Sequence, residues 1–571
     1  MLKKIGNLII KNKFIFTKSN LFILFVLLLA AVLRFVVITK VPPSLNWDEV
    51  SHGYNAYSIL KTGKDEWGIA FPTIFRAYGD YKLPLYIYLT AISETFFGLT
   101  TLAIRLPSVL AGVATVIFTY LLTKKLFNEK TALISSLLVA VEPWSFFLSR
   151  GAFEANLSLA LIVSGFYFFV EGLNKPKFLP ISALLLGLSV WTYNSARIFV
   201  PLLTIVYILI YKDQLLKLRI KSKKYITYSL LVLFFFLVPM FYQLANTTGQ
   251  ARYSKVAIID EGAVAQINES RALSKYSSAV SRIIYNKGTY FISQFSKNYF
   301  SHFSLDFLAL KGGSHYQFSV PDHGLIYTIN IVFSLLGLLW LLKSRSKESF
   351  FVLMWLFLSP IPASLTREAP HVLRAITMLP IPMIITALGF VFLLGRLKEK
   401  KISQSMTTII YLGILFVFAE NYLTLYFENY PKKYSWSWQY GYKEAVNYAK
   451  ENYGNYDKII MTKKYGEPHE FVLFFMSWEP EKYMNDENLI RFAQSDWFWV
   501  DRFDKFYFIN DWEIPKKKGV FVLESKKEVV DCTGKIKCLL ITSPGNFPEG
   551  WENLKTINFL DGAPAFEIYE N

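Results

Sequence analysis

The sequence predicts a polytopic α-helical membrane protein with a C-terminal α/β domain, and three observations carry this prediction. The 571 residues are 53% hydrophobic with a mean hydropathy of +0.31, which is too apolar for an ordinary soluble protein. Apolar runs long enough to cross a bilayer recur from Leu21 to Tyr426. Beyond Tyr426 the chain becomes rich in charged residues, Trp and Tyr, and helical and strand-like patterns alternate.

The apolar runs predict about 11 transmembrane helices. A helix rises about 1.5 Å per residue, so each run reaches across much or all of the hydrocarbon core. The first run has no clear small-residue cleavage site and is predicted to be a retained anchor. The predicted spans are 21–39, 106–123, 131–148, 155–173, 178–192, 198–211, 226–244, 324–342, 349–365, 372–394 and 406–426.

Basic residues in the connectors predict the orientation of these spans. The formal net charge is +18, but much of the Lys and Arg lies in short connectors, so the charge reports topology and not nucleic-acid binding. Alternate connectors hold 23 Lys and Arg, whereas the short loops on the opposite side hold four Arg. The positive-inside rule therefore places the amino terminus in the cytoplasm and the C-terminal domain outside the plasma membrane.

The apolar stretch Leu83–Leu99 is predicted to be a helix lying in the membrane interface. Counting it as a span would reverse every later loop and place the basic connectors outside, although a true span remains the alternative. The predicted regions are a cytoplasmic basic N-terminus at 1–20, a transmembrane domain at 21–426 with outer loops 40–105 and 245–323, and an extracytoplasmic α/β domain at 427–571.

The C-terminal tail contains the chain's two cysteines, Cys532 and Cys538. A Cys₄ metal site within one chain is excluded, and a small-loop disulfide is expected on the oxidising side, with free thiols as the alternative. The tail is also rich in tryptophan, which either stacks on carbohydrate or forms core. These tryptophans are Trp436, Trp438, Trp478, Trp497 and Trp499.

Ionisable residues collect at the predicted outer ends of several helices. Such groups are costly at membrane depth unless they are paired or hydrated, so they are candidates for function. They are Asp48, Glu49, Asp80, Lys82, Arg105, Arg150, Glu154, Arg197, Arg367, His371 and Arg374, with Tyr193 and Asn194 beside Arg197.

Each candidate also has a structural alternative. Any of the arginines can snorkel to lipid phosphates, and Glu154 can simply pair with Arg150 on a helix. His371, beside a proline, can cap a helix start. His315 and His323 flank Asp322, but two histidines and one carboxylate in a loop are weak evidence for a metal.

Carboxylates and cations that face outward suit the transfer of a sugar from a lipid phosphate to a hydroxyl. One carboxylate is enough as a general base, because the phosphate already leaves well once its charge is stabilised. Lys and Arg supply charge-assisted hydrogen bonds to that phosphate. A single displacement of this kind inverts the anomeric centre. No glycine-rich phosphate loop or G-x-G-x-x-G turn is present, so a cytosolic nucleotide-sugar site has no support.

The order of several short motifs resembles the GT-C membrane glycosyltransferases of the protein O-mannosyltransferase and aminoarabinose transferase superfamily. The resemblance covers roughly residues 20–425 and implies a GT-C fold whose catalytic domain is the predicted transmembrane domain. The motifs are Trp47-Asp48-Glu49, Gly79-Asp80-Tyr81-Lys82-Leu83-Pro84-Leu85, Arg105-Leu106-Pro107-Ser108, Ser149-Arg150 with Glu154, and Pro370-His371-Val372-Leu373-Arg374.

The resemblance implies roles for particular residues. Asp48 is expected to be the catalytic base, with Glu49 in support, and Lys82 is expected to contact donor phosphate. A metal-ligand carboxylate of some aminoarabinose transferases is replaced by Tyr81, so no metal ligand is assigned and a divalent metal is left open. The further phosphate-binding candidates are Arg105, Arg150, Arg197, Arg367, Arg374 and His371, and the substrate-binding candidates are Asp80, Tyr81, Glu154, Tyr193, Asn194 and His315.

The resulting expectation is an inverting glycosyltransferase. It moves a hexose such as mannose, or a pentose, from a polyprenyl-phosphate donor to a hydroxyl of a lipid, glycan or protein acceptor at the outer membrane face. Its partners are donor, acceptor and membrane lipids, with no nucleic acid. A lipid-linked glycan flippase or transporter and a glycan ligase or polymerase are the alternatives, although transporters usually carry paired repeats that are not evident here.

Overall fold

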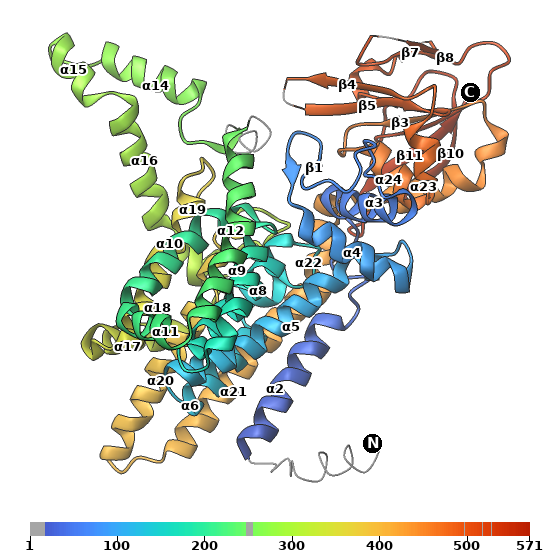
Figure 1. The fold of residues 1–571 in the computed structure, drawn as a ribbon. Helices are drawn as coiled ribbons and strands as arrows, with labels where there is room; N and C mark the ends of the chain where they lie inside the picture. Colours follow the sequence, from blue (N-terminus) through green and yellow to red (C-terminus); the bar gives the residue numbers. More distant parts are fainter. Residues whose placement is uncertain (1–17, 247–254, 496, 517, 527) are drawn as a thin grey trace.

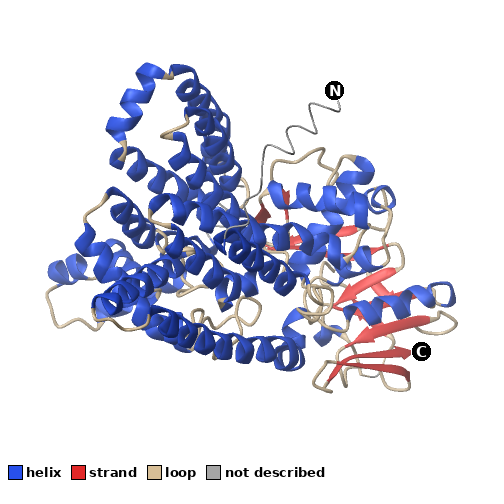
Figure 2. Ribbon diagram, turned by 90° about the horizontal axis from the view of Figure 1, so that it is seen from below, coloured by secondary structure: helices blue, strands red, loops and turns tan. Residues whose placement is uncertain are grey.

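The computed structural model describes residues 18–246, 255–495, 497–516, 518–526 and 528–571. It consists of a bundle of apolar helices and a C-terminal part built around a β-sheet (Figure 1). Figure 2 shows most of the strands gathered on one side of the molecule together with several helices, whereas the other side is helical. The predicted N-terminal segment 1–20 lies outside the described residues except for its last three positions, as does the 247–254 part of the second outer loop.

Every one of the eleven predicted spans coincides with an apolar helix. Six described helices are long and apolar enough to cross a membrane alone, and a seventh span results if the bent pair of α10 and α11 (Lys212–Lys221) is counted as one. The chain is thus an integral membrane protein. The helices are α2 (Lys18–Phe35), α5 (Thr101–Leu126), α6 (Glu129–Val141), α8 (Glu154–Gly172), α9 (Leu179–Val190), α10 (Asn194–Ile210), α12 (Lys223–Ala245), α17 (Ile329–Ser344), α18 (Lys347–Leu358), α20 (Ile381–Glu399) and α21 (Gln404–Thr424).

Prolines divide several spans near their outer ends. The helix α6 ends at Val141, and Pro143 begins the short α7 (Pro143–Leu148). Likewise α18 is followed by Pro360 and the four-residue α19 (Ile361–Ser364). A proline lacks the backbone N–H that continues a helix, so the chain turns at these points. This explains why some predicted spans are two short helices instead of one long one.

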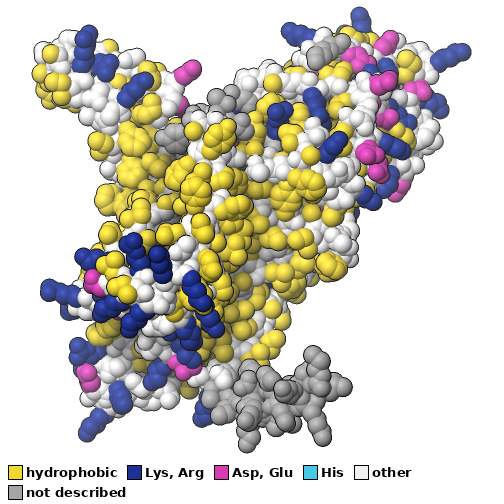
Figure 3. All heavy atoms as spheres, in the orientation of Figure 1, with side chains coloured by type: hydrophobic (Ala, Val, Ile, Leu, Met, Phe, Trp, Pro, Cys, Tyr) yellow, Lys and Arg dark blue, Asp and Glu magenta, His cyan; other side chains and the backbone are white. Residues whose placement is uncertain are grey.

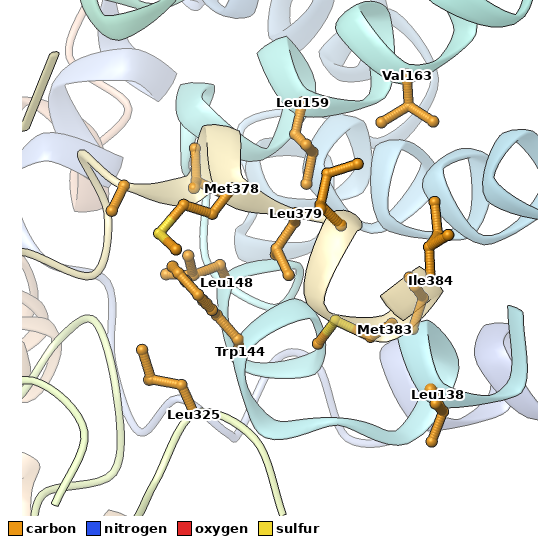
Figure 4. Close-up of a cluster of buried hydrophobic side chains, with 14 of the residues drawn as sticks. Leu138, Trp144, Leu148, Leu159, Val163, Leu325, Met378, Leu379, Met383 and Ile384 are labelled. Atoms are coloured by element: carbon orange, nitrogen blue, oxygen red, sulfur yellow. The ribbon is translucent and has the colours of Figure 1, made fainter. Parts of the chain in front are cut away.

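The core of the bundle is apolar and closely packed. Figure 4 shows Trp144, Leu148 and Leu159 facing Met378 and Leu379, all of them buried. These side chains come from α7, α8 and the segment before α20. The hydrophobic core thus extends to this end of the bundle. Its packing holds α7 and the segment before α20 in place.

The contact between α17 and α20 depends on two glycines. A Cβ added to Gly337 would lie 1.9 Å from the carbonyl oxygen of Ile385, and a Cβ added to Gly389 would lie 1.9 Å from that of Phe333. Only glycine allows two helix backbones to approach this closely, as in other membrane helix pairs. The pair is therefore specified by side-chain size and not by hydrophobicity.

The first outer segment contains α3 (Trp47–Thr62), the hairpin β1 (Phe75–Arg76) and β2 (Tyr81–Lys82), and α4 (Pro84–Phe97). The 14 residues of α4 measure about 21 Å, which is less than the roughly 30 Å hydrocarbon core. Large apolar side chains of α4 such as Phe96 are exposed, at 76%. Helices α6, α9 and α18 are shorter still, so the interfacial position of α4 rests on the charge of the connectors and stays a prediction.

The second outer segment forms α14 (Glu261–Ala272), α15 (Ser278–Ile284) and α16 (Lys287–Ser301). Figure 1 shows these helices, α3 and the β-sheet at the same end of the bundle. Figure 3 shows Lys and Arg side chains gathered at the other end, around α11 and α20. The connectors that are rich in Lys and Arg therefore lie together at one end of the bundle, as the sequence predicted.

The C-terminal part contains a mixed seven-stranded sheet in the order β10-β11-β9-β3-β6-β5-β4. Strands β9, β3 and β6 are parallel and form its buried centre. Helices α23 (Tyr442–Glu451) and α24 (Pro468–Phe475) accompany β3, as expected for an α/β arrangement. The strands are β3 (Lys458–Thr462), β4 (Ile490–Gln494), β5 (Trp497–Phe503), β6 (Phe506–Ile509), β9 (Cys538–Thr542), β10 (Glu552–Asn558) and β11 (Pro564–Glu570).

Side chains from both parts share one hydrophobic cluster. Val50 and Tyr54 of α3 pack with Phe471 and Phe474 of α24, and all four are buried. The sheet part is therefore fastened to the helix that follows the first span. Cys532 and Cys538 are joined by a disulfide, as expected. Both belong to a second, smaller hydrophobic cluster of the sheet part.

Candidate active site

The amino-terminal end of α3 is fixed by a capping box. The Asn46 side chain accepts a hydrogen bond from the Glu49 N–H at 2.9 Å, and the Glu49 carboxylate accepts one from the Asn46 N–H at 3.2 Å. This pattern begins the helix at Trp47 and makes Asp48 its second residue. The positive end of the helix dipole favours a carboxylate at this place.

Glu49 is held in a buried ion pair with Arg105 of α5. Both nitrogen–oxygen distances of the bidentate contact are 2.9 Å, and the two side chains are almost fully buried. The Ala152 N–H also donates to Glu49 at 2.9 Å. Arg105 donates further to the carbonyl oxygens of Ile38 and Pro42. Glu49 therefore supports the start of α3, and its own lone pairs are largely occupied.

Asp48 points the other way and meets Lys82. The Lys82 Nζ lies 2.9 Å from Asp48 Oδ1, and the Asp48 side chain is 42% exposed whereas that of Lys82 is 11% exposed. Lys82 is placed by the β1–β2 hairpin, in which it pairs with Phe75. A solvent-accessible carboxylate thus stands beside a largely buried ammonium group.

This pair borders a cavity of about 210 Å³ at the outer end of the bundle. Segments far apart in the sequence meet there, namely α3, the hairpin, the start of α8, the loop after α16 and the loop after α19. Eight of the fifteen residues predicted for the site line it: Asp48, Glu49, Lys82, Glu154, Tyr193, His315, His371 and Arg374.

Two basic side chains on one loop line the wall. Arg374 donates to the hydroxyl of Thr366 at 3.0 Å and to the carboxylate of Glu368 at 3.0 Å. His371 accepts a hydrogen bond from the Arg374 N–H at 3.2 Å, so it caps a turn and not the helix start that the alternative predicted. It does so while lining the cavity. The loop thus brings a guanidinium and an imidazole to the same wall.

His315 lies against Phe318, with ring centroids 4.1 Å apart. Burial lowers the pKa of His315, and the nearby Arg374 acts in the same direction although Glu368 opposes it. The ring is therefore predominantly neutral near pH 7. A neutral imidazole both donates and accepts, which suits contact with a hydroxyl group of a substrate.

The cavity opens into a larger groove of about 1450 Å³ between the bundle and the sheet part. The two share His315, Gln317, Phe318, Glu368 and His371. Basic and aromatic side chains line the rest of the groove, including Lys311, Arg367, Lys433, Lys464, Trp47, Tyr434, Trp436 and Tyr465. Of the five tryptophans singled out in the tail, Trp438 is fully buried, whereas Trp436 is 45% exposed and lines this groove.

Three predicted phosphate-binding arginines occupy structural positions instead. Arg105 is used by Glu49 and the backbone, as described above. Arg150 is fully buried and donates to the carbonyl oxygens of Leu33, Arg34, Val36 and Val41, so it closes the end of α2 and does not pair with Glu154. Arg197 donates to the Val190 carbonyl oxygen and to Gln243. None of these three arginines lines the cavity.

Other predicted residues lie near the cavity without lining it. Arg367 borders the groove and pairs with Asp260. Asp80 accepts a hydrogen bond from the N–H of Tyr81 at 2.7 Å, at the turn of the hairpin. Asn194 begins α10. Around Lys82, and likewise around His315 and His323, the described carboxylates and histidines form no group of three metal ligands.

Sequence reasoning missed Gln317 and Glu368, which line both the cavity and the groove. Glu368 directly follows Arg367, a predicted site residue, so its position in the sequence could have indicated it. Nothing in the local sequence indicates Gln317. It also missed Arg34, a buried residue of α2 that donates to the carbonyl oxygens of Val139 and Ala140. These donor bonds fasten α2 to α6.

Comparisons with known proteins agree with this architecture. Residues 82–242 match the family model described as dolichyl-phosphate-mannose-protein mannosyltransferase. A comparison with curated protein sequences gives no significant match. The structure of ArnT from Cupriavidus metallidurans in the apo state superposes with a TM-score of 0.55 at 11% identity, covering 97% of this chain and 98% of that chain.

Two further structures show the same resemblance. ArnT from Cupriavidus metallidurans bound to undecaprenyl phosphate gives a TM-score of 0.52 at 11% identity, with 96% and 97% of the chains covered. An Archaeoglobus fulgidus oligosaccharyltransferase in complex with Zn and sulfate gives 0.50 at 14% identity, and the match covers 80% of this chain but only 61% of that longer chain. At these identities the likeness concerns the fold. The chain thus has the fold of these structures, and its residues 82–242 resemble the dolichyl-phosphate-mannose-protein mannosyltransferase family.

Proposed function

We propose that this protein is an inverting glycosyltransferase that moves a sugar from a polyprenyl-phosphate donor to an acceptor hydroxyl at the outer face of the membrane. The observation that carries the proposal is the Asp48–Lys82 pair, with a nitrogen–oxygen distance of 2.9 Å, at the edge of the cavity. It combines a solvent-accessible carboxylate with a cation in the place where the outer loops meet. A general base and a phosphate-binding cation are the two parts that the reaction needs.

In the proposed reaction, Asp48 accepts the proton of the acceptor hydroxyl. The acceptor oxygen forms a bond to the anomeric carbon as the bond from that carbon to the donor phosphate oxygen breaks, and the electron pair leaves with the polyprenyl phosphate. Lys82 and Arg374 stabilise the phosphate charge. Attack and departure on opposite faces invert the anomeric centre. Glu49 and Arg105 hold α3, and therefore Asp48, in position.

The groove has one kind of side chain for sugar rings and another for the charged headgroup of the donor. Its aromatic residues Trp436 and Tyr465 offer faces on which sugar rings stack, and its basic residues offer attraction to an anionic headgroup. The family match supports a mannose-like hexose as the sugar, with a pentose as the other candidate. The ArnT structure bound to undecaprenyl phosphate supports a polyprenyl phosphate as the donor. The acceptor is a lipid, a glycan or a protein.

The proposal is tested by incubating the purified protein with polyprenyl phosphates that carry different radiolabelled sugars, together with a membrane extract. We expect label to leave one lipid donor and to enter a second fraction, in a linkage opposite in anomeric configuration to the donor. A flippase would instead move intact labelled lipid across proteoliposomes without transfer. A ligase would require an oligosaccharide diphosphate. Either of those results contradicts the proposed function.

Replacement of Lys82 by methionine is expected to weaken donor binding. A charge-assisted hydrogen bond is worth roughly 1.5–3 kcal/mol, so the KM for the lipid donor should rise on the order of 10- to 100-fold. Steady-state kinetics with varied donor measures this change. Lys64→Met is the matched control, because Lys64 is an exposed residue of the same outer segment and should leave KM unchanged. An equal rise in both variants would contradict the assignment.

The proposal also requires that the cavity face the cell exterior in the plasma membrane, with the amino terminus in the cytoplasm. Trp512 of the sheet part is 78% exposed, and Lys400 is exposed at the opposite, basic end. A membrane-impermeant maleimide added to intact cells should label Trp512→Cys and not Lys400→Cys. Both should react after lysis. The reverse pattern would place the site in the cytosol and contradict the use of an outer-face donor.

A further inference from the structure

We propose that Glu66, His469 and Glu470 form a binding site for a divalent transition metal of the zinc class, at the contact between the first outer segment and the sheet part. One ligand atom from each residue lies within 4.8 Å of the others. All three side chains are buried, with exposures of 3%, 5% and 1%. The site is separate from Lys82 and from the catalytic cavity, and it does not depend on the proposed glycosyl transfer.

Unpartnered oxygen atoms point to a missing ligand in this place. The Oε2 atom of Glu470 is buried and has no hydrogen-bond partner among the described residues, and the same holds for Oε2 of Glu467. Buried polar atoms are nearly always hydrogen-bonded, and a buried carboxylate is costly unless a cation is nearby. Arg491 attracts the Glu66 carboxylate and donates to the main-chain oxygen of Glu66, and Lys463 attracts Glu467, but neither cation is a hydrogen-bond partner of the two unpartnered oxygen atoms. A bound cation would compensate the clustered carboxylates.

The ligand set indicates which kind of cation fits. One imidazole and two carboxylates suit zinc and its transition-metal neighbours, whereas magnesium and calcium favour oxygen ligands alone. Two ligands of a tetrahedral zinc ion lie about 3.4 Å apart, so the three side chains need to close by about 1 Å around the ion. Rotation of the glutamate side chains supplies this movement.

Neighbouring side chains are placed to orient the ligands. His469 Nε2 lies 3.9 Å from Glu470 Oε1, on the side of the candidate site, while His469 Nδ1 lies 3.7 Å from Glu467 Oε2. Asn55 of α3 donates to the Glu66 carboxylate at 3.2 Å and accepts from the Glu66 N–H at 3.2 Å. Metal-binding histidines commonly direct their second nitrogen at a carboxylate, and metal-binding carboxylates are commonly hydrogen-bonded in this way.

The position of the site gives the ion a structural role. Glu66 belongs to the segment that follows α3, whereas His469 and Glu470 lie in the first turn of α24. An ion bound to all three would link the sheet part to α3, beside the apolar contact of these two helices. Because Asp48 is at the amino-terminal end of α3, the link would hold the catalytic carboxylate in register with the cavity.

The test is the metal content of the full-length protein, purified through a tag without histidine, saturated with Zn²⁺ and freed of excess by gel filtration. We expect one equivalent of zinc by plasma mass spectrometry, and one histidine with oxygen ligands by zinc X-ray absorption. Glu66→Gln and His469→Gln, on the two sides of the contact, should each lower the bound zinc below 0.1 equivalent, because even the loss of a side chain that only orients a ligand typically costs about 10- to 100-fold in metal affinity. His323→Gln is the matched control and should keep the full equivalent.

Thermal unfolding separates metal loss from misfolding. Zinc should raise the Tm of the wild type and of His323→Gln, and it should leave the Tm of Glu66→Gln and His469→Gln unchanged, while all four proteins elute as the same folded species. Wild-type protein without zinc after saturation would overturn the proposal and leave Glu66 and Glu470 as two glutamates that share a proton. Zinc retained at one equivalent in both ligand variants would overturn it as well.

Discussion

Asp48→Asn is expected to abolish sugar transfer while leaving the protein folded. Asparagine preserves the size of the side chain and its place in the first turn of α3, but it cannot accept the proton of the acceptor hydroxyl. Loss of a general base typically lowers the rate by about 10²- to 10⁴-fold. The decrease should appear in kcat, with the KM for the lipid donor changed little. Label transfer from a polyprenyl-phosphate sugar measures both quantities.

Asp80→Asn is the matched control for this experiment. Asp80 is in the same outer segment and precedes Lys82 by two residues, but its carboxylate accepts the Tyr81 N–H and does not line the cavity. Its kcat should stay within a few-fold of wild type. Full activity of Asp48→Asn, or equal losses in the two variants, would rule out Asp48 as the base.

Arg105→Met is expected to have the largest effect on stability. The substitution leaves Glu49 buried without its cation and frees the carbonyl oxygens of Ile38 and Pro42. Removing one partner of a buried, hydrogen-bonded ion pair costs roughly 3–5 kcal/mol. We expect lower yield, a lower Tm in detergent and loss of transfer, because the start of α3 is no longer fixed. Thermal unfolding followed by tryptophan fluorescence measures the change.

Arg367→Met is the matched control for the ion pair. Arg367 pairs with Asp260, but the side chains are 48% and 30% exposed, and a pair of this kind contributes about 0–1 kcal/mol. Its Tm should stay close to that of wild type. If Arg105→Met also unfolded at the wild-type temperature, the pair of Arg105 and Glu49 would not be what holds α3. Glu49→Gln, which leaves Arg105 without its anion, should resemble Arg105→Met.

The membrane part was predictable because its signal is local and strong. A run of apolar residues is a helix in a bilayer whatever its neighbours, so each predicted span coincides with a helix. The breaks at Pro143 and Pro360 shorten two of these helices, and six or seven described spans are long enough to cross a membrane. In the tail, β3 (Lys458–Thr462) and β9 (Cys538–Thr542) are strands of the α/β part that the alternating pattern predicted.

The candidate site was predictable as a set of motifs but not as a set of roles. Asp48 and Lys82 were singled out together, and the structure brings them to 2.9 Å although 34 residues separate them. Arg105 and Arg150 came from the same kind of motif, yet they bond to backbone carbonyl oxygens 61 to 117 residues away. A motif identifies an arginine, but only its partners decide whether it meets a substrate.

The sequence by itself determined that this chain spans a membrane, and it predicted that the basic connectors and the charged tail lie on different sides and that carboxylates and cations collect at the outer helix ends. The tertiary structure decided which of these groups line a common cavity and which form buried structural hydrogen bonds and ion pairs. It also brought Glu66 to His469 and Glu470 across about 400 residues. The physical reason is that a membrane helix is specified by the hydropathy of consecutive residues. The role of a charged side chain depends instead on its desolvation and on its partners, which are brought together only by the fold.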